Sequence, residues 1–175
     1  QVTRMIGCHV DITKRKRAEE TLRYILESVA STTGQEFFSK LLTFLCETCS
    51  VDLAFVGELM PGEPAQVQTL AVIRDGERGD NFSYELAGTP CNDLWQVGDA
   101  CHFTDVQAAY PTDEHLVQLG VNAYCGIPIW NGDQQPIGLV VTLSRNGFED
   151  PEQVRALLQV LGSRCGAELQ RERAE

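Results

Sequence analysis

Several signatures of enzymes and metalloproteins are missing from this 175-residue sequence. It has no glycine-rich phosphate loop and no nucleophile elbow. The three histidines, His9, His102 and His115, stand in separate segments, without a second histidine or a carboxylate at metal-ligand spacing. The sequence therefore predicts no metal site and no catalytic site of these kinds.

Positive charge is absent from a long central stretch, because no lysine or arginine occurs between residues 79 and 144. The whole chain carries a net charge of −11. Such an acidic chain repels phosphate backbones, so we expect no nucleic-acid partner. The uncharged or acidic central stretch also argues against an anionic ligand such as a cyclic nucleotide. Apolar runs are far shorter than the ~20 residues that cross a bilayer, so we expect no membrane contact.

The cysteines are odd in number and irregularly spaced, at positions 8, 46, 49, 91, 101, 125 and 165. In a chain of this size, that pattern favours reduced, mostly buried thiols and a cytoplasmic location. We therefore expect all seven thiols to be free. Cys46 and Cys49 have a redox-like or zinc-like spacing, but they lie in an amphipathic segment without a second ligand pair, which favours core thiols.

Hydrophobic periodicity predicts helices near both ends and strands between them. We expect helices from Thr13 to about residue 33, over 35–49, and from Asp150 to the end. Strands are predicted over 52–60, 66–74, 81–86, 100–103, 124–130 and 137–144. The irregular stretch 87–123 separates two strands and contains two short predicted helices, so it could cover a pocket.

Two apolar stripes in the terminal helices are wider than one small sheet needs. This predicts a homodimer through the terminal helices, with an interface formed by Leu22, Ile25, Leu26, Val29, Val154, Leu158, Leu161 and Leu169.

Four short motifs in order identify a family resemblance: Tyr84 to Cys91, Tyr110 to Asp113, Leu119 to Pro128 and Pro136 to Gly138. Together they resemble GAF domains of bacterial sensor histidine kinases and cyclic-di-GMP enzymes. The resemblance implies an α+β fold (an α/β sandwich), with a central antiparallel sheet of about six strands and the terminal helices packed on one face.

The stretch from Gly7 to Glu20 resembles the closing strand and exit helix of a PAS domain. The expected organisation is therefore a PAS strand over 1–12, a helical linker and first GAF helix over 13–33, and the GAF domain over 34–175. The chain would then be a piece of a longer bacterial signalling protein, whose output domain lies beyond it.

Aromatic residues and one cysteine cluster in the half of the chain that carries the irregular stretch. We predict a ligand pocket there, with Trp95 and Tyr124 lining the same cavity or its lid; filling of the core beneath the loops is the alternative. The candidate ligand-binding residues are Tyr84, Cys91, Trp95, Phe103, Tyr110 and Tyr124.

Some GAF domains attach a bilin through a cysteine that is often followed by histidine, as in Cys101-His102. In that family the cysteine follows the helix that corresponds to 111–119, whereas here it precedes this helix. We therefore expect neither bilin nor haem, and no other cofactor.

The resulting hypothesis is a non-catalytic sensory or relay module. It would bind a small neutral or apolar ligand, or none, and pass a signal through its terminal helices. Two alternatives remain open: a thiol-dependent reductase of free methionine sulfoxide, using Cys91, Cys101 or Cys125, and a purely structural dimerisation spacer.

Overall fold

The computed structural model describes residues 32–98 and 100–175, together with eight single positions between 13 and 27. The expected PAS strand over 1–12 lies outside the described residues, as do Leu22, Ile25, Leu26 and Val29 of the expected dimer interface. Among the helices that are described, none is both long enough and apolar enough to cross a membrane.

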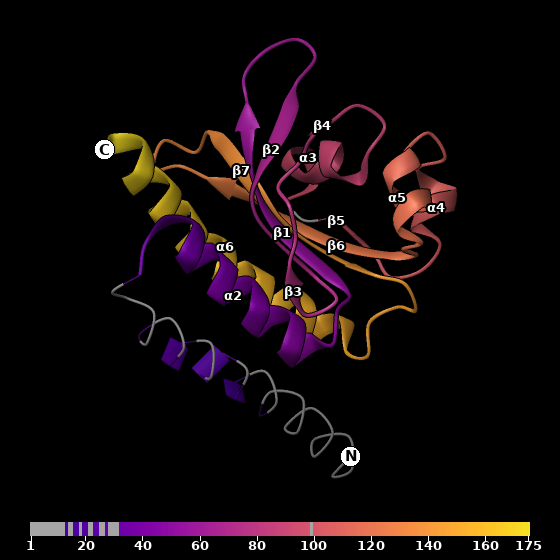
Figure 1. The fold of residues 1–175 in the computed structure, drawn as a ribbon, viewed down its shortest axis with the longest axis horizontal. Coiled ribbons are helices and arrows are strands. Elements are labelled where there is room, and N and C mark those ends of the chain that lie inside the picture. The colour runs from indigo at the N-terminus through magenta and orange to yellow at the C-terminus, as the bar shows by residue number, and fades with distance from the viewer. Residues whose placement is uncertain are drawn as a thin grey trace, which may run out of the picture.

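One antiparallel sheet forms the centre of the fold, with strand order β3-β2-β1-β7-β6-β5 and with β4 paired to β2 (Figure 1). The central pair, β1 and β7, aligns Leu53 with Leu143 and Val56 with Val140. The strands are β1 (Leu53–Met60), β2 (Gln66–Arg74), β3 (Glu77–Arg78), β4 (Ser83–Glu85), β5 (Ala100–His102), β6 (Ala123–Trp130) and β7 (Pro136–Ser144). The expected antiparallel α+β fold is confirmed.

Two long helices, α2 (Gly34–Cys49) and α6 (Pro151–Ala174), lie side by side and cover one face of the sheet (Figure 1). Helix α6 begins where the sequence predicts, because the Asp150 carboxylate accepts a hydrogen bond from the Gln153 N–H and proline occupies the first turn. Their apolar stripes close the main core against the sheet.

Short elements cover the opposite face (Figure 1). They are a 3-10 turn η1 (Pro90–Asp93) and the helices α3 (Leu94–Val97), α4 (Val106–Ala109) and α5 (Glu114–Leu119). The sequence analysis missed β3 and α4, which are only two and four residues long. The helix expected over 111–119 begins at Glu114, after its cap residue Asp113.

Alternation along the strands separates two hydrophobic cores. In β1, Ala54 and Val56 face the long helices, whereas Leu53 and Phe55 face the short elements. Successive side chains of a strand point to opposite faces, so each strand supplies both cores. We call these surfaces of the sheet the helix face and the loop face.

Candidate functional site

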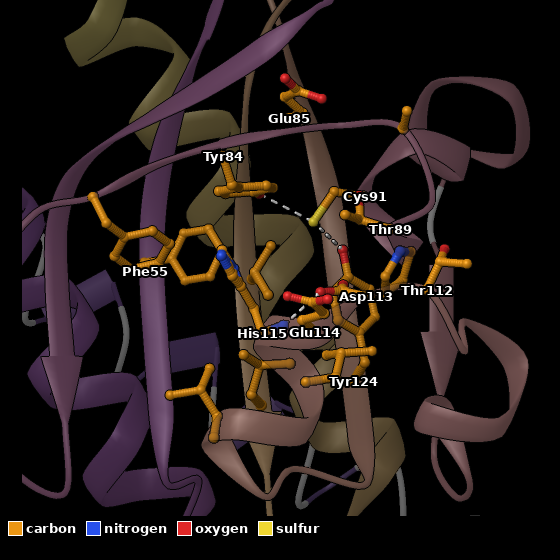
Figure 2. A pocket seen from close by; sticks show the side chains of 17 residues that line it. Phe55, Tyr84, Glu85, Thr89, Cys91, Thr112, Asp113, Glu114, His115 and Tyr124 are labelled. Carbon is orange, nitrogen blue, oxygen red and sulfur yellow. Dashed lines mark hydrogen bonds between the residues drawn. The ribbon is translucent and has the colours of Figure 1, made fainter.

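A cavity of about 260 Å³ opens on the loop face (Figure 2). Its walls come from β1, β4, β6 and β7, from the turn at 87–91, and from residues 112–119 around α5. The floor is apolar, with Val141 and Leu143 of β7 and Leu116 of α5 among its lining residues. The sheet therefore supplies a rigid base, and the irregular stretch supplies the opposite wall.

Cys91 is the centre of the polar part of this cavity. Its sulfur accepts hydrogen bonds from the hydroxyls of Tyr124, at 3.1 Å, and Tyr84, at 3.2 Å (Figure 2). Burial raises the pKa of the Cys91 thiol to about 11, although these hydroxyl bonds act in the opposite direction. The pKa values of both tyrosines are also raised, chiefly by burial. All three groups are therefore neutral at pH 7.

Local structure explains how these three side chains meet. Tyr84 stands on β4 opposite Val67 of β2, and Cys91 lies one turn further along the chain, in η1. Thr89 closes the intervening turn, because its hydroxyl donates to the Leu86 carbonyl at 2.7 Å. Gly88 in that turn has φ +77°, and a Cβ there would lie 2.7 Å from the Thr112 hydroxyl oxygen. The turn can therefore lie close to the start of α5.

Tyr124 depends on a second glycine. A Cβ built on Gly126 would lie 2.5 Å from the Tyr124 hydroxyl oxygen and 3.0 Å from its ring carbon Cζ. The absence of a side chain at 126 therefore lets the Tyr124 ring lie along its own strand, where it is almost fully buried. This orientation directs its hydroxyl toward Cys91.

Three acidic residues line the cavity: Glu85, Asp113 and Glu114. The side chain of Glu85 extends from β4 on the side opposite to Tyr84 (Figure 2). The Asp113 carboxylate caps α5 by accepting a hydrogen bond from the His115 backbone N–H at 3.1 Å. Burial raises the pKa of this carboxyl, partly offset by His115. Glu85 and Glu114 are exposed, and neither has an ion-pair partner within the part of the chain that the structure describes. Lysine and arginine are absent from the cavity lining.

A profile of the GAF domain family matches residues 18–169 of the chain. The chain belongs to the GAF family. The match covers the whole sheet and most of α6, so the described fold is that of the GAF domain. No curated protein sequence matches the chain.

Solved GAF structures share this fold at low sequence identity. The GAF domain of a phosphoenolpyruvate-protein phosphotransferase from Coxiella burnetii aligns with a TM-score of 0.70 and 16% identity, over 91% of this chain and 96% of that one. The A. aeolicus nlh2 GAF domain aligns with a TM-score of 0.68 and 14% identity, over 90% and 99%.

A chromophore-binding domain has a similar fold. The domain of a Stigmatella aurantiaca bacteriophytochrome gives a TM-score of 0.68 at 17% identity, over 88% of this chain and only 60% of that chain. At these identities, the likeness of all three structures to this GAF domain shows the fold alone.

Of the six predicted ligand-binding residues, the structure brings three to the cavity: Tyr84, Cys91 and Tyr124. Trp95 packs on the same face as Tyr124 but does not line this cavity, and its indole Nε1 is buried without a hydrogen-bond partner among the described residues. Trp95 and Tyr124 therefore share the loop-face core, but of the two only Tyr124 lines the cavity.

Phe103 and Tyr110 lie elsewhere in the GAF domain. Phe103 packs against the helix-face core, with the Arg155 guanidinium 5.5 Å from its ring centroid. Tyr110 donates a 2.6 Å hydrogen bond to Asp93, and His102 lies 3.2 Å from the same hydroxyl. The two Tyr110 contacts link the end of α4 to η1 and β5, outside the cavity.

Sequence analysis missed several cavity residues, above all Phe55, Phe82 and the carboxylates of Asp113 and Glu114. Phe55 carried a usable signal, because it alternates with core residues along β1. The carboxylates carried none, because a cap residue and its neighbour at a helix start look the same whether they face solvent or a cavity.

The prediction that all seven thiols are free is wrong at Cys101 and Cys125, which form a disulfide. They stand directly opposite each other on β5 and β6, with their Cα atoms 4.1 Å apart. Cys46, Cys49, Cys91 and Cys165 are free and buried. The error arose because strand register, which sets such a pair, was not available from spacing alone.

The α6 half of the predicted dimer interface is buried inside the GAF domain itself. Val154, Leu158, Leu161 and Leu169 are each at most 2% exposed and belong to the helix-face core. The homodimer stays a prediction, and an interface on α6 would have to use its outer side chains, among them Gln159, Ser163 and Ala167.

Proposed function

We propose that this GAF domain is a non-catalytic sensory module whose loop-face cavity binds one small molecule that is not an anion. The observation that carries the proposal is the cavity itself. It combines a rigid apolar floor with a small number of oriented polar groups, as ligand sites do, and it lies beneath short elements that ligand binding can order.

The ligand we propose is small. A volume of about 260 Å³ lies just below the ~300–1,000 Å³ typical of pockets for drug-sized molecules. A large chromophore does not fit this space, and the thiol of Cys101 is engaged with Cys125. We therefore propose no bilin or haem, although a protein of similar fold is a chromophore-binding domain.

Thiol chemistry is poorly supported. Reduction of a sulfoxide needs a reactive thiolate and a second thiol that resolves the intermediate. The pKa of the Cys91 thiol is raised to about 11 by burial. The sheet separates Cys91 from Cys46, Cys49 and Cys165, which belong to the opposite core. Among the described residues, Cys91 therefore has no free thiol on its own face.

A cavity-blocking variant tests the proposal. Ala87 is exposed at the turn that lines the cavity, and Ala109 is an equally exposed alanine on α4 that does not line it. We expect native mass spectrometry of freshly purified protein, or thermal-shift screening against small metabolites, to detect a ligand. Ala87→Trp should abolish that binding, and Ala109→Trp should preserve it. Equal behaviour of the two variants would refute the cavity as the site.

We also propose that the domain relays its state within a longer cytoplasmic signalling protein, as a homodimer. The contact that supports this joins the two long helices, because the Glu168 carboxylate on α6 accepts a 2.8 Å hydrogen bond from the Gly34 N–H at the start of α2. Movement of the segment that precedes Gly34 would therefore act directly on α6.

Residue insertions that change the rotational phase of the predicted N-terminal helix test the proposed relay of signal. Each inserted residue turns a helix by about 100°, and seven return it nearly to phase. In the full-length protein, insertion of one residue after Glu20 should disrupt regulation of the output, and insertion of seven should largely restore it. Regulation that is unchanged across the series would identify a passive tether. Light scattering that shows a monomer at micromolar concentrations would refute the homodimer.

A further inference from the structure

The cavity lining carries an excess of acidic side chains, with His115 as its one basic side chain among the described residues. Glu85, Asp113 and Glu114 all line it, and the lining contains no lysine or arginine. Two of the three carboxylates, on Glu85 and Glu114, are exposed and have no ion-pair partner among the residues that the structure describes. A cavity with walls of one sign raises the local concentration of ligands of the opposite sign.

Aromatic rings form part of the cavity wall. The Phe55 ring makes edge-to-face contacts with Phe82, at a centroid distance of 5.5 Å, and with Tyr84, at 6.0 Å. The His115 ring meets Tyr84 in the same manner at 6.4 Å. Rings at steep angles to one another form a concave surface, and the negative face of an aromatic ring attracts an organic cation.

The polar part of the cavity, around Cys91, offers hydrogen-bond acceptors rather than donors. The hydroxyl protons of Tyr84 and Tyr124 are both directed to the Cys91 sulfur, so the lone pairs of the two oxygens remain. The Thr89 hydroxyl donates to the Leu86 carbonyl. An anion would therefore find few donors in the cavity, whereas an ammonium group would find several oxygen acceptors.

A bare metal ion fits this arrangement poorly. Metal ions need several ligand atoms gathered around one point, and no group of three His, Cys, Asp or Glu side chains in the described part of the chain is arranged in this way. Carboxylates spread around an aromatic wall suit a positive charge that is distributed over an organic group.

We propose that the cavity selects a small organic cation, with an alkylammonium or quaternary ammonium group between the aromatic rings and the carboxylate of Glu114. The inference rests on the proposed ligand-binding function and names the chemical class of its ligand. It departs from the sequence-based expectation of a neutral or apolar ligand, because the carboxylates at the cavity were not foreseen.

Three probe molecules of nearly equal shape but different charge test which ligand charge the cavity prefers. Choline is cationic, 3,3-dimethylbutan-1-ol is its neutral carbon isostere, and 3,3-dimethylbutanoate is an anionic analogue. Isothermal titration calorimetry of the whole chain should show choline binding at least about tenfold more tightly than the neutral isostere, with the anion weakest.

Charge-removing variants localise the effect. In Glu114→Gln, choline affinity should fall about tenfold while affinity for the neutral isostere stays unchanged. Glu47→Gln removes an exposed carboxylate from α2, on the opposite face, and should change neither. Ala87→Trp should abolish binding of every probe.

The outcomes separate this inference from the function on which it rests. If the neutral or anionic probe binds as tightly as choline, and Ala87→Trp abolishes that binding, the cation inference is wrong and the ligand-binding function stands. If no probe binds, and the native protein also carries no small molecule, both are wrong. An unchanged choline affinity in Glu114→Gln would also overturn the inference.

Discussion

The two faces of the sheet are covered in different ways, and this difference explains the cavity on the loop face. The helix face is covered by α2 and α6, whose long apolar stripes close its core with Leu41, Leu45 and Leu158 fully buried. The loop face is covered by helices of four to six residues and by turns. Short elements cannot fill the space above a sheet continuously, so a cavity remains there.

The cysteines illustrate the same contrast. Cys46 and Cys49 lie among apolar side chains on the helix face, where burial raises the pKa of each thiol to about 12. Cys91 on the loop face is equally buried but accepts two hydroxyl hydrogen bonds. Thiols on the helix face therefore serve as small core residues, whereas Cys91 organises polar groups at a cavity.

The largest expected change in the free energy of unfolding comes from replacing one leucine on each face of the sheet. Leu158→Ala removes a fully buried side chain from the helix-face core and should lower the free energy of unfolding by about 3 kcal/mol. Leu116→Ala at the cavity should cost less than about half as much, because its side chain already borders empty space. Urea denaturation measures both. Equal losses would mean that the loop face is packed as tightly as the helix face.

A glycine substitution should test whether the orientation of the Tyr124 ring shapes the cavity. Gly126→Ala places a Cβ against the Tyr124 ring and should cost about 2 kcal/mol through overpacking. The control is Gly132→Ala, whose Cβ would meet only the Gln170 side chain, at 3.8 Å. Thermal unfolding compares the two, and the Gly126→Ala variant should also lose probe binding. Intact binding would show that the Tyr124 orientation does not shape the cavity.

A pH-dependent test examines the contact between α2 and α6. The pKa of the Glu168 carboxyl is lowered from its ordinary value of 4.5, chiefly by hydrogen bonds from Arg171 and further by the Gly34 N–H. Because the folded-state pKa is the lower one, the stabilisation is complete above about pH 4.5 and is lost as the pH falls through the folded-state value.

Glu168→Gln should therefore lower the free energy of unfolding by about 1.5 kcal/mol at pH 7, and by progressively less in acid. Urea denaturation from pH 3 to 7 measures the difference. Glu152→Gln, in the exposed first turn of the same helix, is the control and should show a smaller change. A Glu168→Gln effect that does not depend on pH would contradict the charged contact.

The smallest effect concerns the hydroxyls around Cys91. Tyr124→Phe and Tyr84→Phe each remove one donor to the sulfur and should each cost under about 1 kcal/mol, since sulfur is a weak acceptor. The double variant should cost more than the two single losses combined, because the sulfur then has neither tyrosine donor. Strict additivity in this cycle would show that the three groups do not act as a unit.

The sequence by itself determined the elements and the two faces. The apolar runs of β1, β2 and β7 and the long stripes of α2 and α6 are local signals that predicted these strands and helices, and the GAF resemblance implied their antiparallel α+β arrangement. The cap at Asp150 was also readable, because a cap depends only on neighbouring residues. Short elements such as β3 and α4 lacked enough residues to show a period.

Only the tertiary structure decided which residues share the cavity. Trp95 and Phe103 were as aromatic as Tyr84 and Tyr124, but one packs into the loop-face core and the other against the helix face. The pairing of Cys101 with Cys125 required the register of β5 on β6. The carboxylates at the cavity required the position of α5 over the sheet. Each of these features joins residues distant in sequence, and their distances are set by packing, which no local pattern records.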